Sequence, residues 1–372
     1  DTCGLAEVIR SGDVSPVEAV QASIDRIQKL DGELNAVVTE RFERALDDAA
    51  GDIPDGPFKG VPFILKDLWT SSANEPMHLG NKALKEINYI SPVESDLARR
   101  YREAGFIVVG RSNTPEFGLV GTTEPESYGP SRNPWNTDYG TGGSSGGAAA
   151  AVASGMVPSA NASDGGGSIR IPAAMCGLVG LKPSRGRVPM GPMQEEWGLS
   201  IQHVVCHSMR DAAGILDATA IPTMGDGVVA PNYGQPYINQ VGAAPGELRI
   251  GLWNESPRED LEIHPDCQRL TRDAAELLEK LGHIVEEAHP AVLDDPAIGG
   301  RFSAIWMAGA NLTLKNLSKI LQREVTVDDV EIGTWLMAQV GAKTSGLDVL
   351  QAQADMGSMR RSTLEWWENG WD

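Results

Sequence analysis

Two glycine-rich segments with serines inside them are the residues of this sequence best suited to chemistry. The first is GGSSGG at 142–147, and the second is DGGGSIRIP at 164–172. The first segment runs directly into the helix-forming alanines at 148–151, whereas a flexible linker would be bordered by polar residues. Glycines let a backbone approach a reacting group closely and present its N–H groups there. The two segments therefore indicate serine chemistry beside a closely packed backbone.

Three alternative interpretations of the first segment are weaker. A P-loop needs a Lys-Ser/Thr pair after its glycines, and a dinucleotide-binding loop needs a third glycine where Ser145 stands. GGSSG at 142–146 does match the G-x-S-x-G nucleophile elbow, which would need a downstream histidine as base. The histidines available there, none in a distinctive context, are His203, His207, His264, His283 and His289. The elbow also leaves the second serine, Ser168, unexplained.

Lys66 is the candidate base for a reactive serine. A serine hydroxyl must lose its proton as it attacks, and a lysine can accept that proton only as the neutral amine. Lys66 follows the apolar run PFIL at 62–65, and desolvation disfavours the ammonium form and lowers its pKa. The alternative is a lysine whose stem lies on the core while its head reaches water. The presence of two serine segments favours the base.

Taken together, these motifs resemble the signature of the amidase signature family. The resemblance covers nearly the whole chain and is carried by GVPFILKD at 60–67, RSNTPE at 111–116, NPWN at 133–136, both serine segments, and GLVGLKP at 177–183. Within the family, DGGG at 164–167 and the closing WWENGWD at 366–372 are most similar to bacterial amidases related to 6-aminohexanoate cyclic-dimer hydrolase.

The resemblance implies a role for each site residue. Ser168 would be the acyl-accepting nucleophile, Lys66 the base, and Ser144, joined to Gly143 by a cis peptide bond, the bridging serine that relays the proton. Asp164 and Arg170 would brace the loops. The oxyanion hole and substrate contacts are expected at Gly165, Gly166, Gly167, the Ser168 N–H and Gly118, with further pocket residues in 117–123 and 189–197.

The reaction implied is hydrolysis of a small-molecule amide through an acyl-enzyme, with no cofactor and no metal. One alternative is the glutamine-hydrolysing A subunit of a tRNA-dependent amidotransferase, which would work in an obligate complex. SRGRV at 184–188 is more typical of a stand-alone amidase. Family members continue past the point that matches residue 372, so we expect the chain to lack the family's C-terminal part. An inactive truncated relative is therefore a further alternative.

The elements that must position these residues alternate between helices and strands. Helices are expected at 15–27, 40–50, 95–104, 148–153 and 265–281, and strands at 60–65, 106–110, 248–252 and 283–285. This alternation predicts an α/β fold. The resemblance implies one large domain over 1–372, with a catalytic core at about 60–190 and a mixed, mostly parallel central sheet covered by helices on both faces.

Composition excludes several classes of protein and partner. The 372 residues carry 31 Lys+Arg against 51 Asp+Glu, a net charge of −20, and no basic cluster of the kind that binds nucleic acid or an anionic membrane surface. The small-residue run at 148–153 is too short to cross a bilayer. The 4 cysteines are far apart, which is typical of a reducing compartment. We expect a cytoplasmic protein, for which a homodimer is a possible assembly.

Overall fold

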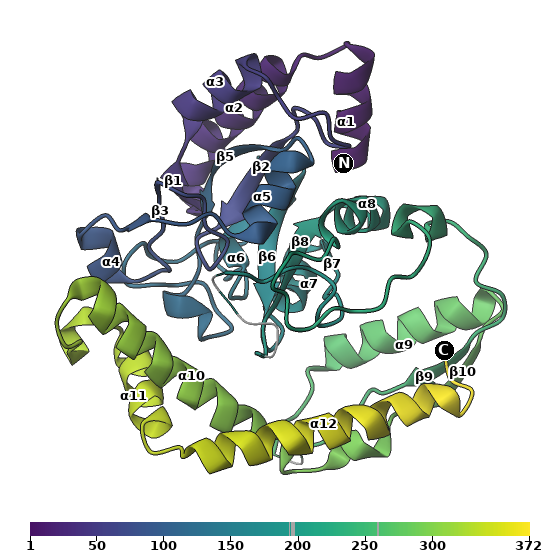
Figure 1. The fold of residues 1–372 in the computed structure, drawn as a ribbon. Helices are drawn as coiled ribbons and strands as arrows, with labels where there is room; N and C mark the ends of the chain where they lie inside the picture. The colour runs from purple at the N-terminus through teal and green to yellow at the C-terminus, as the bar shows by residue number, and fades with distance from the viewer. Residues whose placement is uncertain (193, 195–197, 259) are drawn as a thin grey trace. The chain divides into compact units, whose positions relative to one another are not determined.

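The structure is a computed structural model that describes residues 1–192, 194, 198–258 and 260–372. The chain divides into two compact units. Unit 1 comprises Asp1–Gly242 and Thr326–Glu331, and unit 2 comprises Ala243–Val325 and Ile332–Asp372. Figure 1 labels their helices and strands. Lys66, Ser144 and Ser168 all belong to unit 1.

Unit 1 is built on a six-stranded sheet in the order β1-β5-β2-β6-β8-β7. Its strands are β1 (Val37–Glu40), β2 (Pro62–Lys66), β5 (Ile107–Ser112), β6 (Ser159–Asp164), β7 (Val179–Gly180) and β8 (Ile201–Cys206). The central strand β2 is parallel to both β5 and β6, whereas β1 is antiparallel to β5 and β8 is antiparallel to both β6 and β7. Since β7 opposes β8 as β6 does, β5, β2, β6 and β7 share one direction. The predicted mixed, mostly parallel sheet is confirmed.

Helices cover both faces of this sheet, as predicted. The helices of unit 1 are α1 (Thr2–Ser11), α2 (Pro16–Leu34), α3 (Phe42–Ala50), α4 (Lys82–Glu86), α5 (Asp96–Glu103), α6 (Gly146–Ala153), α7 (Arg170–Cys176) and α8 (Met209–Thr219). One buried cluster joins α2, α3 and α6 to Ile64 of β2, and a second joins α1, α5 and α8 to Phe63 and Leu65. Because successive strand residues point to opposite faces, the apolar run PFIL serves both clusters.

Several short elements complete unit 1. The two-stranded antiparallel sheet of β3 (Glu75–Pro76) and β4 (Ile90–Ser91) follows β2. Three single turns of 3₁₀ helix are η1 (Glu116–Gly118), η2 (Tyr237–Gln240) and η4 (Val327–Asp329). The first of these turns, η1, lies in the chain segment predicted to contact substrate.

Unit 2 contains the strand-helix-strand segment that the sequence predicts. The strands β9 (Arg249–Leu252) and β10 (Ile284–Glu287) pair in parallel and are connected by α9 (Pro265–Lys280). The remaining elements are η3 (Ala291–Asp294), α10 (Ile298–Leu321), α11 (Ile332–Gly341) and α12 (Gly346–Glu368).

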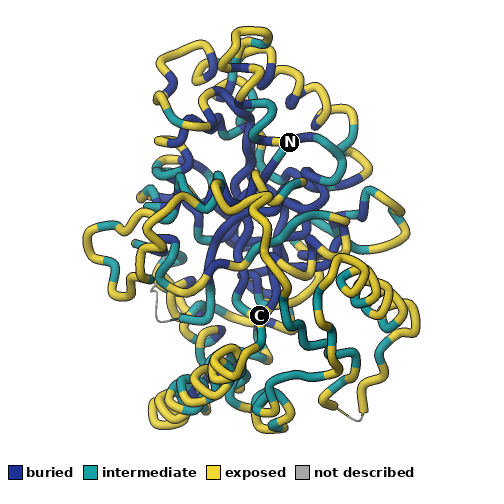
Figure 2. The backbone as a smooth tube through the Cα atoms, turned by 90° about the vertical axis from the view of Figure 1, so that its right-hand side faces the viewer, coloured by how far each residue is buried: buried dark blue, intermediate teal, exposed yellow. Residues whose placement is uncertain are grey.

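Figure 2 colours the backbone by burial: most buried residues belong to the sheet and helices of unit 1, and few to unit 2. No described helix is both long enough and apolar enough to cross a membrane.

Candidate active site

The candidate catalytic residues lie at the carboxyl ends of two neighbouring parallel strands. Lys66 is the last residue of β2, and Asp164 is the last residue of β6. β2 and β6 pair in parallel, so both ends lie at the same edge of the sheet. Ser168 follows in the loop between β6 and α7, and Ser144 lies just before α6. The topology therefore converges on these residues from separate parts of the chain.

Lys66 is fully buried, and its side-chain nitrogen lies among three serine hydroxyls. The distances from Nζ are 2.7 Å to Ser144 Oγ, 2.9 Å to Ser145 Oγ and 2.9 Å to Ser163 Oγ. Burial lowers the pKa of Lys66 well below its usual 10.5, although the negative charge of Asp164 opposes this shift. Hydroxyl groups solvate the amine without supplying a negative charge that would keep it protonated. This surrounding is the one that a lysine base requires.

Sequence reasoning missed Ser145 and Ser163 as partners of Lys66. The Ser145 hydroxyl donates to the Ser163 carbonyl at 3.3 Å and accepts the Ser163 N–H at 3.2 Å, so these two residues hold each other in place. The sequence did contain one indication of this contact, because Ser163 is a small polar residue immediately before Asp164. Its relevance depends on β6 lying beside β2, which the sequence did not reveal.

The glycines around Ser144 are packed against backbone, as the small-residue composition predicts. A Cβ added to Gly143 would lie 2.4 Å from the Thr122 carbonyl oxygen, and one added to Gly147 would lie 2.4 Å from the Asn113 nitrogen. The Gly143–Ser144 peptide bond is cis, as the resemblance implies. Gly118 borders the same hydroxyl, because a Cβ at this position would lie 3.3 Å from Ser144 Oγ. The structure thus brings Gly118, Ser144 and Lys66 together.

The loop that carries Ser168 is held by Asp164. The Asp164 carboxylate accepts hydrogen bonds from the backbone N–H groups of Gly167 at 2.7 Å and Ile169 at 3.2 Å. Arg170 donates to the same carboxylate from Nε at 2.9 Å and Nη2 at 3.0 Å. Burial alone would raise the pKa of Asp164, but the hydrogen bonds and charge of Arg170 hold it below its usual value. Asp164 and Arg170 therefore brace the loop, as expected.

This bracing narrows the set of predicted oxyanion donors. The Gly167 N–H already donates to Asp164, so in this arrangement it is not free to bind an oxyanion. The N–H groups of Gly165, Gly166 and Ser168 are the predicted donors that remain. Ser168 is 8% exposed, and among the described residues its hydroxyl makes no hydrogen bond to Ser144 or to any other group. A direct Ser144–Ser168 hydrogen bond is thus not formed in this structure.

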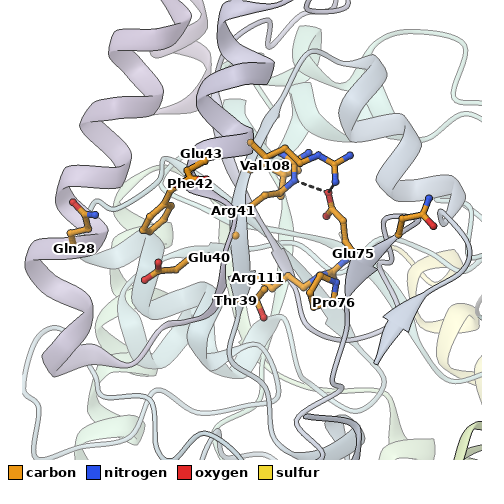
Figure 3. Close-up of a pocket in the computed structure, with 13 residues that line it drawn as sticks. Gln28, Thr39, Glu40, Arg41, Phe42, Glu43, Glu75, Pro76, Val108 and Arg111 are labelled. Atoms are coloured by element: carbon orange, nitrogen blue, oxygen red, sulfur yellow. Dashed lines mark hydrogen bonds and ion pairs between the residues drawn. The ribbon is translucent and has the colours of Figure 1, made fainter. Parts of the chain in front are cut away.

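A cavity of about 590 Å³ lies elsewhere in unit 1 (Figure 3). Its wall contains none of Lys66, Ser144 and Ser168. The residues that line it are Gln28, Thr39, Glu40, Arg41, Phe42, Glu43, Arg44, Asn74, Glu75, Pro76, Val108, Gly110 and Arg111. Arg41 and Arg44 both pair with Glu75 in this wall, at 2.7 and 3.0 Å. Of the predicted pocket segment 189–197, residues 193 and 195–197 lie outside the described residues.

Comparison with known proteins supports the interpretation of these motifs. The Amidase family model matches residues 18–368. The 6-aminohexanoate-cyclic-dimer hydrolase of Paenarthrobacter ureafaciens is 36% identical over 376 residues, which cover 100% of this chain and 76% of that protein. A putative amidase of Synechocystis sp. is 36% identical over 316 residues, which cover 82% of this chain and 61% of that protein.

Comparison with solved structures supports the same family. A solved structure of 6-aminohexanoate cyclic dimer hydrolase matches with a TM-score of 0.96 at 36% identity, covering 100% of this chain and 77% of that one. The match therefore extends to the loops and strand ends that hold the glycine-rich serine motifs. The chain belongs to the amidase family, the amidase signature hydrolases that act on the carbon–nitrogen bonds of amides.

Proposed function

We propose that this protein hydrolyses the C–N bond of a carboxylic amide through an acyl-enzyme on Ser168, with Lys66 as base and Ser144 as proton relay. The observation that carries the proposal is the 2.7 Å hydrogen bond between Nζ of the fully buried Lys66 and Ser144 Oγ. A neutral amine at this position can take a proton from the hydroxyl, and the hydroxyl can take one from a nucleophile in turn.

The other hydroxyls around Lys66 support the choice of Ser144. The hydrogen of the Ser145 hydroxyl is directed to the Ser163 carbonyl, so Ser145 can only accept from the amine. A neutral amine needs a donor for its lone pair, and the Ser144 and Ser163 hydroxyls can provide one. Of these two, Ser144 lies in the loop that borders Gly118, the expected substrate contact.

In the proposed reaction, Ser168 Oγ attacks the amide carbonyl carbon while its proton passes through Ser144 to Lys66. The oxyanion that forms accepts hydrogen bonds from the N–H groups of Gly165, Gly166 and Ser168. One such donor typically contributes about 3 kcal/mol of transition-state stabilisation. The C–N bond then breaks as the amine receives the proton back along the same path. Water next attacks the ester, which releases the acid and restores the Ser168 hydroxyl.

The substrate class follows from the relatives. Because the cyclic-dimer hydrolase is named for an amide of 6-aminohexanoate, we propose a small-molecule amide substrate, linear or cyclic. The 36% identity to this hydrolase favours a stand-alone amidase over the glutamine-hydrolysing subunit of an amidotransferase. A single domain, a cytoplasmic location and a homodimer remain predictions.

Covalent labelling with a fluorophosphonate, followed by intact-protein and peptide mass spectrometry, tests the mechanism. We expect one adduct on Ser168 in the wild type, no adduct in Ser168→Ala, and slow labelling in Lys66→Ala and Ser144→Ala. Lys59→Ala is the matched control, because Lys59 is exposed and belongs to the same part of the chain. An adduct on Ser144, or none on a chain whose circular dichroism shows it folded, would contradict the proposal.

A further inference from the structure

A segment from late in the sequence packs into unit 1 beside the candidate site. This segment, Thr326–Glu331, is called the strap below, and it belongs to unit 1 although the residues on either side of it belong to unit 2. Its turn is closed by its own polar groups, since the Thr326 N–H and hydroxyl donate to the Asp329 carboxylate at 2.8 and 3.0 Å. Val330 is 2% exposed. The strap is thus an internally hydrogen-bonded turn with a buried anchor.

Two buried polar side chains of unit 1 hold the strap. Asn81 Nδ2 donates to the Asp329 carbonyl at 2.9 Å and to Glu116 Oε1 at 2.8 Å. The Glu331 N–H donates to the other carboxylate oxygen of Glu116 at 2.9 Å. Asn81 is fully buried and Glu116 is 2% exposed. Both oxygens of a buried carboxylate are therefore engaged, one by the Asn81 amide and one by the backbone of the strap.

Glu116 begins the turn that reaches Ser144. The next two residues, Phe117 and Gly118, have φ angles of 51° and 70°. A left-handed backbone conformation is uncommon for phenylalanine and persists only where the surrounding structure fixes it. One such support is the Phe117 N–H, which donates to the Leu79 carbonyl at 2.8 Å. The turn then places Gly118 so that a Cβ would lie 3.3 Å from Ser144 Oγ.

We infer that Glu116 is a positioning residue for the proposed amidase reaction: clamped by Asn81 and by the strap, it fixes the turn at Phe117 and Gly118 against the Ser144 hydroxyl. The inference rests on the proposed function, because it assigns Glu116 a task only if Ser144 relays a proton. Glu116 itself touches neither reacting group. It acts through the two residues that follow it in the chain.

A glutamine cannot replace this carboxylate. Asn81 already uses both Nδ2 hydrogens, and its Oδ1 accepts the Leu84 N–H at 2.9 Å to cap α4. The Asn81 amide therefore cannot flip without losing that cap. Asn81 and the Glu331 N–H donate to different oxygens of Glu116, and a glutamine would carry an NH2 group in place of one of them, so it would satisfy either donor but not both. One donor that is buried or partly buried is left unpaired, which disfavours the turn that borders Ser144.

The first test measures the rate at which a fluorophosphonate labels Ser168 in the full chain. For Glu116→Gln we expect labelling to slow by roughly tenfold or more, the scale that small misplacements of reacting groups produce. The pH dependence of labelling should keep the wild-type inflection, because Lys66 keeps its contacts. Asp328→Asn is the matched control: it removes one negative charge from the exposed side of the same strap and should label at the wild-type rate.

A second pair of variants tests the strap while leaving Glu116 intact. Glu331→Pro removes the N–H that donates to Glu116, whereas Glu331→Ala removes the same side chain and keeps that N–H. We expect the proline variant to label several-fold more slowly than the alanine variant, and this pair decides the matter if Glu116→Gln does not fold.

A merely structural role for Glu116 would lower the unfolding temperature of Glu116→Gln without changing how fast the folded protein is labelled. Folded Glu116→Gln and Glu331→Pro that label within twofold of wild type would overturn this inference alone. A folded wild type that is not labelled at all would overturn the proposed function, and this inference with it.

Discussion

The surroundings of Lys66 favour the neutral amine that the proposed base requires. The residue is fully buried, and the groups within hydrogen-bonding distance of its nitrogen are neutral hydroxyls. The charge of Asp164, which is itself paired with Arg170, opposes the loss of the positive charge. Desolvation by burial outweighs this influence, so the pKa of Lys66 falls well below 10.5. In the proposed mechanism, this lowered pKa makes the amine available as a base at pH values where an exposed lysine would be fully protonated.

This shift predicts a pH dependence for labelling of Ser168 by a fluorophosphonate. The rate should rise with pH as Lys66 loses its proton and should level off well below 10.5, because the folded-state pKa is lowered. Lys66→Arg should show no such rise, since the guanidinium stays charged throughout. Rates measured between pH 5 and 10 would check this expectation. An inflection in the wild type near the ordinary lysine value would show that burial does not control the base.

At the scale of elements, the close packing of α6 leaves no room for a side chain at its glycines. Gly147 lies in the first turn of α6, and an added Cβ would lie 2.4 Å from the Asn113 nitrogen and 2.6 Å from the Ala36 carbonyl oxygen. Gly309 lies inside α10, and a Cβ there would meet nothing within 4 Å. Both glycines are helical, but only Gly309 has room beside it for a side chain.

We expect Gly147→Ala and Gly309→Ala to change stability in opposite directions. The first should lower the free energy of unfolding by about 1–3 kcal/mol or more, because backbone must move to admit the methyl group. The second should raise the free energy of unfolding by about 0.5–1 kcal/mol through helix propensity. Urea denaturation of both variants beside the wild type provides the measurement. Equal losses in the two variants would refute the packing argument for α6.

Elements with local signals were predictable from the sequence, and those set by distant pairing were not. The helix predicted from 15 onward is α2. Ser15 and Glu18 form a capping box at its start, and Pro16 is its first residue. The predicted helix at 40–50 instead begins at Phe42, because 37–40 forms β1 against β5, far away in the chain. Likewise β6 has the sequence SANASD, which lacks β-branched residues and becomes a strand only through its neighbours β2 and β8.

The candidate site also has features that were predictable from the sequence and features that were not. Lys66 and the two serine segments have recognisable contexts along the chain, so their approximate places followed from the sequence. The contacts of Ser145 and Ser163 with Lys66 depend on how segments far apart in the chain pack across two strands. The engagement of the Gly167 N–H by Asp164 depends on the conformation of the loop that follows β6. The strap at Thr326–Glu331 is further still from any local signal, since its partners Asn81 and Glu116 lie more than two hundred residues earlier.

At the scale of the whole molecule, burial is distributed very unevenly between the two units. Every residue of β2 is buried, and so is most of α6. In contrast, α12 has Ala352 as its one buried residue, and no residue of α9 is buried, all positions of both helices being described. Local opening costs least where few apolar side chains are buried, so the resistance of a segment to opening should follow this distribution.

Hydrogen exchange monitored by mass spectrometry should therefore separate the two units in the intact chain. We expect amides of β2 and β6 to exchange only on global unfolding, and amides of α9 and α12 to exchange much earlier through local opening. Slow exchange in α9 that matches β2 would contradict this expectation. It would mean that another surface covers Leu270 and Leu277, each 58% exposed here. Repeating the experiment over a range of protein concentrations would then identify that surface: protection that grows with concentration requires another copy of the chain, as in the predicted homodimer.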